Sequence, residues 1–286
     1  MHAASRYLQP ASLPEALTAL AGVSADAPLT VLAGGTDFYP GRVGKPTDVP
    51  LLDITRVAGL SGIRQEQGAW RIGATTTWTA VAEAALPAAF DGLRAAAREV
   101  GGVQIQNAGT VAGNLCNASP AADGVPPLLA LGAEVELTSS TATRRLPVDA
   151  FVLGNRKTAR APQELVTAVI VPEWPANARG AFVKLGTRKY LVISIAMVAA
   201  VVALDDAGRI ARCGIAVGAC SAAAKRLGAL EQRLTGMALA DAVQSVCAAD
   251  MGELAPINDV RGTAEYRIEV AVSLVRQALL QAGGGA

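Results

Sequence analysis

The segment from Gly101 to Asp123 sets the strongest limit on the fold, because it is rich in glycine and small polar residues yet lies beside an apolar stretch. It reads GGVQIQNAGTVAGNLCNASPAAD, and the apolar PPLLAL comes soon after. Glycine lets a backbone approach a ligand or adopt positive φ, and Asn, Ser and Thr supply short polar groups that lose little entropy when fixed. The segment therefore predicts a site for a diphosphate or a flat heteroaromatic ring.

A second segment of the same kind, AGGTD from Ala33 to Asp37, follows a short predicted strand at Leu29 to Leu32. The end of a strand is a usual place for a nucleotide phosphate in α/β proteins, and a nest of backbone N–H groups can bind phosphate without a lysine. A Gly-Gly turn is nevertheless more often an ordinary loop. Neither GxGxxG nor GxxxxGK[ST] occurs, so composition and spacing leave both interpretations open.

Charge and residue content exclude several classes of function. Twenty-five Lys and Arg against 24 Asp and Glu leave a net charge of +1, which gives no general attraction for nucleic acid. The only histidine is His2, which excludes most histidine-based catalysis and zinc chemistry. The four cysteines form no CxxC pair or metal-ligand pattern and predict reduced thiols. Composition therefore argues against histidine-based catalysis and against a metal site in this chain.

The apolar segments of the sequence indicate where in the cell the protein is found. The N-terminal MHAASRYLQP lacks the order of charged, apolar and small residues that marks a signal peptide. The longest apolar run, Leu191 to Leu204, stops at Asp205 and is too short to span a bilayer. The expectation is a cytoplasmic protein without a membrane span.

Local patterns predict an α+β chain in two domains, residues 1–175 and 176–286, joined near WPANARG. The first domain divides into subdomains at about 1–55 and 56–175. The local patterns predict the following helices and strands: helices at 13–22, 79–86, 92–100, 222–234, 239–254 and 264–282, and strands at 29–32, 49–55, 164–172, 192–204 and 209–220, with a hairpin inside 60–77. The second domain is expected to be a three-stranded antiparallel sheet packed on a helical bundle.

Five stretches in this order resemble one known family. QIQNAGTVAGNLCNASPAAD and VLAGGTDFYP resemble the two flavin signatures of the xanthine dehydrogenase and carbon monoxide dehydrogenase family of molybdenum hydroxylases. RIGATTTWTAV, FVKLGTRKYLVISIAMVAA and RGTAEYRIEVAVSLVRQAL are similar to other parts of its FAD-binding medium subunit. The resemblance covers nearly the whole chain and implies a PCMH-type FAD-binding domain.

The resemblance also implies which residues bind FAD. Backbone amides of the first signature are expected around the pyrophosphate, and the second signature on the opposite wall. Asp123 is expected on the adenosine ribose, Ala74 beside the flavin, and Tyr190 either over the flavin ring or exposed at a loop tip. Ala112 stands where the family commonly has glycine. The implied cofactor-binding residues are Leu32, Ala33, Gly34, Gly35, Thr36, Asp37, Ala74, Thr110, Ala112, Gly113, Asn114, Ser119, Asp123, Leu165, Lys184 and Tyr190.

The implied function is that of an electron-transfer subunit. A large subunit would hold the molybdenum–pterin cofactor and a small subunit two [2Fe-2S] clusters, in a heterotrimer or its dimer. FAD in this chain would pass electrons to NAD+, oxygen or a quinone. Two alternatives remain open at this point: a free-standing FAD-dependent oxidase of related fold, and a scaffold subunit that has lost FAD.

Overall fold

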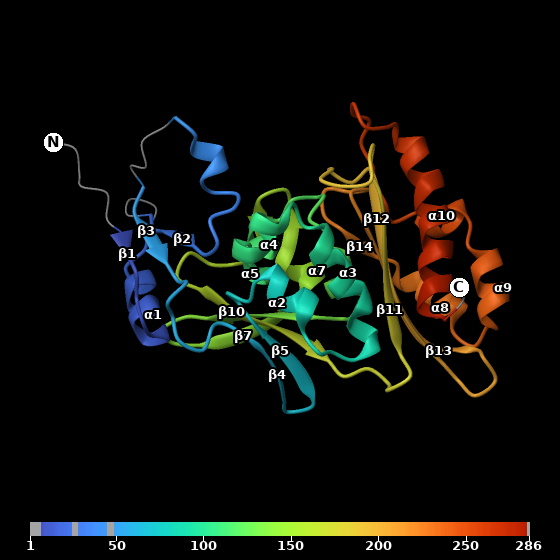
Figure 1. The fold of residues 1–286 in the computed structure, drawn as a ribbon, viewed down its shortest axis with the longest axis horizontal. Helices are drawn as coiled ribbons and strands as arrows, with labels where there is room; N and C mark the ends of the chain where they lie inside the picture. Colours follow the sequence, from blue (N-terminus) through green and yellow to red (C-terminus); the bar gives the residue numbers. More distant parts are fainter. Residues whose placement is uncertain (1–6, 25–27, 45–48, 285–286) are drawn as a thin grey trace.

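A computed structural model describes residues 7–24, 28–44 and 49–284. His2 lies outside these ranges. The three larger of four sheets, with three, five and four strands, follow one another along the chain, and we call the parts of the chain that carry them the N-terminal, middle and C-terminal units. Figure 1 shows them side by side, from the blue N-terminal unit through the green middle unit to the red C-terminal helices.

The N-terminal unit is a small parallel sheet with one long helix. Its strands pair in the order β1-β3-β2. Ser12 caps the helix by accepting from the Glu15 amide, while the Glu15 carboxylate accepts from the Ala11 amide at 3.0 Å. This confirms the helix start predicted from Ser12 and Pro14. The elements are β1 (Tyr7–Leu8), α1 (Leu13–Ala21), β2 (Thr30–Leu32), η1 (Pro40–Arg42) and β3 (Leu51–Asp53).

The middle unit is an antiparallel sheet in the order β4-β5-β10-β6-β7, with helices over it. Its sheet strands are β4 (Ile63–Glu66), β5 (Ala69–Gly73), β6 (Glu134–Thr138), β7 (Thr143–Pro147) and β10 (Leu165–Pro172), and a separate hairpin is formed by β8 (Val152–Gly154) and β9 (Lys157–Thr158). Its helices are α2 (Trp78–Glu83), η2 (Ala88–Phe90), α3 (Asp91–Glu99), α4 (Val103–Ala108), α5 (Val111–Asn117), α6 (Val125–Ala130) and α7 (Val148–Phe151). The glycine-rich segment 101–123 thus holds two short helices, α4 and α5.

The C-terminal unit is an antiparallel sheet covered by helices, as expected. The three long strands β11, β12 and β13 pair in sequence order, and a two-residue strand, β14, extends the sheet by pairing with β13. The elements are β11 (Arg179–Leu185), β12 (Ala196–Leu204), β13 (Ile210–Gly218), β14 (Lys225–Arg226), α8 (Gly228–Leu234), α9 (Leu239–Ser245), η3 (Ala248–Met251) and α10 (Ala264–Ala282). Helix α10 has its predicted bounds, whereas α8 begins six residues late because Lys225 and Arg226 pair as a strand.

Strand β12 is buried on both faces. Its side chains alternate between two hydrophobic cores: Met197, Ala199, Val201 and Ala203 belong to the core shared with the middle unit, and Ala196, Val198, Ala200 and Val202 to the core under the C-terminal helices. A strand covered on both faces reads as a continuous apolar run. This explains the apolar run up to Leu204. Among the described residues, the helices are all too short or too polar to cross a bilayer.

Candidate functional site

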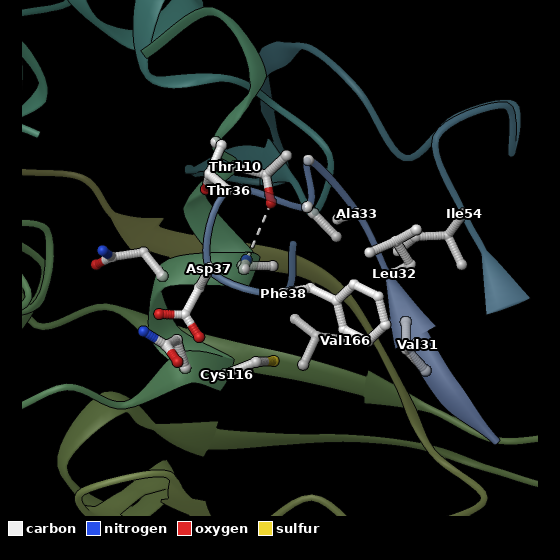
Figure 2. Close-up of a pocket in the computed structure, with 18 of the residues that line it drawn as sticks. Val31, Leu32, Ala33, Thr36, Asp37, Phe38, Ile54, Thr110, Cys116 and Val166 are labelled. Carbon is white, nitrogen blue, oxygen red and sulfur yellow. Dashed lines mark hydrogen bonds between the residues drawn. The ribbon is translucent and has the colours of Figure 1, made fainter. Parts of the chain in front are cut away.

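A cavity of about 750 Å³ lies between the N-terminal and middle units. Its size falls within the range usual for cofactor sites. Figure 2 shows apolar side chains, among them Val31, Leu32 and Ile54, on one side of the cavity, with Thr36 and Thr110 away from them. This division suits a ligand that has an apolar ring at one place and polar groups at another.

The first glycine-rich segment packs its backbone directly against the second. A Cβ atom on Gly34 would lie 1.7 Å from the carbonyl oxygen of Ala108, so no side chain fits at this position. Gly35 has a φ of +69°, a conformation that L residues rarely adopt. The chain therefore needs both glycines to bring residues 33–38 against α4 and still turn away from β2.

The same segment leaves its amides available to a ligand. Within the described part of the chain, none of the N–H groups from Ala33 to Phe38 donates a hydrogen bond to protein. Amides in successive turn residues form a nest that binds anions. Residues 33–38 therefore offer an anion-binding surface on the wall of the cavity.

In the second glycine-rich segment, the backbone amides at the start of α5 donate hydrogen bonds to other groups of the protein. The Val111 and Ala112 amides donate to the carbonyl oxygens of Thr76 and Ala74, at 3.0 and 3.4 Å. Those of Gly113 and Asn114 donate to Thr110, to its Oγ1 and its carbonyl oxygen respectively, both at 3.0 Å. Thr110 Oγ1 thus caps α5, which Figure 2 marks with a dashed line. What this wall offers to a ligand is mainly side chains and carbonyl groups.

The side chain of Asn114 carries a buried polar atom on this wall. Its Oδ1 has no hydrogen-bond partner among the described residues. A buried polar group without a partner costs about 1–3 kcal/mol, so Asn114 is better explained by a ligand that pairs with it. Ala112, in contrast, is buried and its methyl group belongs to the core of the middle unit.

The charges around the cavity favour an anion. Three arginines, Arg42, Arg156 and Arg160, line it against one carboxylate, Asp37. Arg42 stacks over the Phe38 ring at 4.0 Å, and Arg156 forms a two-pronged ion pair with Asp37 at 2.9 and 3.3 Å. Arg160 donates to three carbonyl oxygens, including that of Glu164 at 2.7 Å, and so holds its own loop.

Sequence reasoning missed these arginines. Arg156 and Arg160 belong to the hairpin β8–β9 and the loop behind it, more than a hundred residues from the segment that they face. Their signal was RKTAR, three basic residues in a short run after a Gly-Asn turn. A basic cluster at a turn is a reasonable candidate for a phosphate site.

Twelve of the sixteen expected residues lie on one cavity. They are Leu32, Ala33, Gly34, Gly35, Thr36, Asp37, Ala74, Thr110, Ala112, Gly113, Asn114 and Leu165. Both glycine-rich segments and the two flanking strands are thus brought together. Ser119, Asp123, Lys184 and Tyr190 do not line this cavity.

Asp123 and Lys184 form a buried ion pair at the boundary between the middle and C-terminal units. Lys184 Nζ lies 2.9 Å from Asp123 Oδ1, and Ser194 Oγ donates to the same oxygen at 3.3 Å. Burial raises the pKa of Asp123 to about 6, although the attraction of Lys184 opposes the rise. A ribose contact would have to compete with Lys184 for this carboxylate.

The two remaining residues lie at the surface of loops. Ser119 Oγ accepts from the Ala121 amide at 3.3 Å and so fixes the turn after α5. Tyr190 is 62% exposed in the loop between β11 and β12, with Lys189 Nζ 5.2 Å from its ring centre. Tyr190 stands apart from the cavity in this conformation of the loop.

Metal or thiol chemistry has no counterpart in the described residues. No group of three His, Cys, Asp or Glu side chains is placed to bind a metal among them. Cys116 lines the cavity, but burial raises the pKa of its thiol to about 11, which keeps it protonated and unreactive.

The residues of the cavity fit an FAD molecule. Free amides at 33–38 and a surplus of arginine suit the diphosphate, the unpaired Asn114 Oδ1 suits a polar group of the ligand, and the apolar side suits a flat ring. The close approach at Gly34 shows that the two walls are already fitted to each other.

Comparison with known proteins identifies the family. Residues 3–174 match the FAD binding domain in molybdopterin dehydrogenase, and residues 181–282 match the CO dehydrogenase flavoprotein C-terminal domain. The chain is 37% identical over 190 residues to the nicotinate dehydrogenase FAD-subunit of Eubacterium barkeri, in an alignment that spans 64% of each protein. It is 30% identical over 282 residues to the carbon monoxide dehydrogenase medium chain of Hydrogenophaga pseudoflava, covering 96% of this chain and 95% of that one.

A solved structure agrees over the full length. The reconstituted CO dehydrogenase from Oligotropha carboxidovorans contains a chain that superposes with a TM-score of 0.90 at 29% identity and covers all of both chains. The family matches, the relatives and the cavity point to the same cofactor. This chain belongs to the xanthine dehydrogenase and carbon monoxide dehydrogenase family of molybdenum hydroxylases, among its FAD-binding subunits.

Proposed function

We propose that this chain is the electron-transfer subunit of a cytoplasmic molybdenum hydroxylase. In that role it takes electrons from the [2Fe-2S] clusters of a small partner subunit and passes them to NAD+, oxygen or a quinone. A large partner subunit holds the molybdenum–pterin cofactor and the organic substrate, in a heterotrimer or its dimer. The observation that carries the proposal is the cavity with the unpaired amides of residues 33–38, because its chemistry is that of a dinucleotide site.

FAD supplies the redox chemistry, as it can store two electrons and release them singly or together. The chain's own residues bind and orient it. The 33–38 amides would hold the diphosphate, Arg42 would add positive charge to the same cavity, and Asn114 would fix a polar group on the opposite wall. Leu32 and Leu165 provide apolar contacts. Among the described residues, the cavity contains no acid or base that the transfer of electrons would require.

Residues outside the cavity have a place in the same proposal. The pair Asp123–Lys184, together with Ser119, lies along the path from α5 to the C-terminal unit. We expect them to meet the part of FAD that extends beyond the cavity. Tyr190 reaches the flavin ring only if the loop between β11 and β12 folds back toward the cavity.

The first test is the visible absorbance of the purified chain. Bands near ~370 and ~450 nm, with FAD rather than FMN in the supernatant after heat precipitation, are expected of a bound FAD. A colourless chain that takes up no added FAD contradicts the proposal and supports a scaffold. Turnover of an organic substrate by the chain alone, without partners, would instead support a free-standing oxidase.

The second test concerns the electron route. Co-expression with a small [2Fe-2S] subunit and a large molybdenum–pterin subunit should give a complex that co-purifies. Reduced [2Fe-2S] subunit should bleach the flavin band in a stopped-flow experiment, and adding NAD+, oxygen or a quinone separately should restore it for the true acceptor. Failure of the reduced subunit to bleach the band, with FAD bound, would overturn the electron route but leave FAD binding intact.

A further inference from the structure

One ion pair on the cavity wall joins the N-terminal unit to the middle unit. The guanidinium of Arg156 donates to both carboxylate oxygens of Asp37, at 2.9 and 3.3 Å. Arg156 belongs to the hairpin β8–β9 of the middle unit, and Asp37 is the last residue of the AGGTD segment. Among the described residues, this is the only ion pair between the N-terminal and middle units. Both residues line the cavity.

The backbone of Arg156 is fixed to the opposite wall. Its amide donates to the Ala118 carbonyl oxygen at 3.3 Å, at the end of α5. Arg156 has a φ of +54°, as residues in the tight turn of a β-hairpin often do, here between β8 and β9. Arg156 therefore joins both glycine-rich segments, the second through its backbone and the first through its side chain.

Stability alone gives little reason for this arrangement. The Arg156 and Asp37 side chains are 66% and 48% exposed. Exposed ion pairs are screened by solvent and contribute little to folding, although two-pronged arginine–carboxylate pairs are the better case. The place of the pair on the cavity wall, where it joins the N-terminal and middle units, points to a role that concerns the ligand.

The electrostatics support such a role. The Asp37 carboxylate belongs to the residue whose amide completes the anion-binding nest, so an unpaired Asp37 would repel a diphosphate. With Arg156 in place the carboxylate is neutralised, and the two walls are tied together beside the ligand. The pair thus favours FAD binding both by neutralising the Asp37 carboxylate and by linking the two walls, and each effect requires both charged side chains.

We propose that the Arg156–Asp37 ion pair is a clasp that retains FAD by closing the cavity between the N-terminal and middle units. Arg156 is a positioning residue, acting through Asp37 and the 33–38 loop. This inference rests on the proposed FAD function. Because the pair is exposed, the clasp opens on its own, and its strength sets how fast FAD leaves.

The test measures FAD release from the full-length chain by the rise in flavin fluorescence after a large dilution into flavin-free buffer. Arg156→Gln should release FAD about three- to tenfold faster than wild type, the range expected for loss of one exposed pair of good geometry. High salt should speed release from wild type and not from the variant, because salt screens exposed charges. The unfolding midpoint of the apo chain should stay unchanged.

Two further variants make the result specific. Arg64→Gln removes an ion pair of similar length and exposure within the β4–β5 hairpin, 2.9 Å from Glu66, and should release FAD at the wild-type rate. The charge swap Asp37→Arg with Arg156→Asp should restore slow release. A swap that stays as fast as Arg156→Gln, or an Arg156→Gln variant with unchanged release, overturns the clasp.

The outcomes also separate this inference from the function on which it rests. If wild type binds no FAD, the proposed function fails. If wild type binds FAD and Asp37→Asn leaves release unchanged while Arg156→Gln speeds it, Arg156 contacts the phosphate directly, and only the clasp is wrong.

Discussion

The two glycine-rich segments that form the walls of the cavity use similar residues for opposite purposes. The first, 33–37, keeps its amides unpaired and ends at Asp37, whose ion pair with Arg156 is exposed. The second, 101–123, pairs the amides of Val111 to Asn114 within the protein and ends at Asp123, whose ion pair with Lys184 is buried. The first wall is thus built to exchange a ligand and the second to remain rigid. Two segments of similar composition can therefore have different roles in ligand binding.

The largest expected effect comes from the point where the two walls meet. Gly34→Ala would place a Cβ atom 1.7 Å from the Ala108 carbonyl oxygen, and backbone on both sides leaves no room to yield. We expect a loss of about 4 kcal/mol or more in the free energy of unfolding, with loss of flavin. Gly41→Ala is the matched control, since a Cβ there meets nothing within 4 Å on the same cavity. Urea unfolding with equal values for both variants would contradict the close contact.

The buried pair should matter more for folding than the exposed one. Lys184→Met leaves Asp123 buried without its cation, which we expect to cost about 3 kcal/mol at pH 8. The cost should shrink at pH 5, because Asp123 with a pKa of about 6 then carries a proton. Lys189→Met, in the neighbouring exposed loop, should be neutral. An equal cost for Lys184→Met at both pH values would show that the lysine acts through packing alone.

Asp123 itself should give a pH-dependent stability of unusual sign for a carboxylate. Its folded pKa of about 6 lies above its ordinary value of 3.8, because burial disfavours the charge. Its contribution is therefore full below about pH 4 and is lost as the pH rises through 6. At about 1.4 kcal/mol per pKa unit, wild type should lose up to about 3 kcal/mol relative to Asp123→Asn across this window. A difference that stays flat between pH 4 and 7 would be evidence against the raised pKa.

The smallest effect should separate binding from folding on the second wall. Asn114→Leu removes a buried side-chain oxygen that has no partner among the described residues, so the apo chain should gain up to about 1 kcal/mol in the free energy of unfolding. FAD affinity should fall about tenfold, as a hydrogen bond to the ligand is lost. Denaturation of the apo chain and equilibrium titration with FAD measure the two quantities. Loss of apo stability would mean that Asn114 serves the fold.

Much of this molecule could be predicted from local sequence. Ser12 and Pro14 mark the start of α1, and the apolar repeat at 264–282 gives α10 its bounds. Asp205 and Gly208 mark the turn between β12 and β13. Most of the cavity lining could also be predicted, because the resemblance to the family identified both glycine-rich segments as walls of one cofactor site.

What could not be predicted depends on contacts between distant residues. The strand β7, TRRLP, has exposed basic side chains and no apolar alternation, and it exists because β6 pairs with it. Arg156 reaches Asp37 only through the turn of a hairpin formed 119 residues later. The first two amides of α5 are paired because the carbonyl groups of Thr76 and Ala74 lie beside them, and the amides of 33–38 meet no such acceptor. No local pattern in the sequence reveals this difference.

Strand β12 carries a consequence for how the chain comes apart. Since alternate residues of one strand complete two different cores, neither core can be exposed without stripping a face of the other. The two domains predicted from the sequence are therefore not expected to unfold independently. A fragment ending near residue 175 would lack Met197 and Val201 from its own core, and the intact chain should melt across this boundary as one cooperative unit.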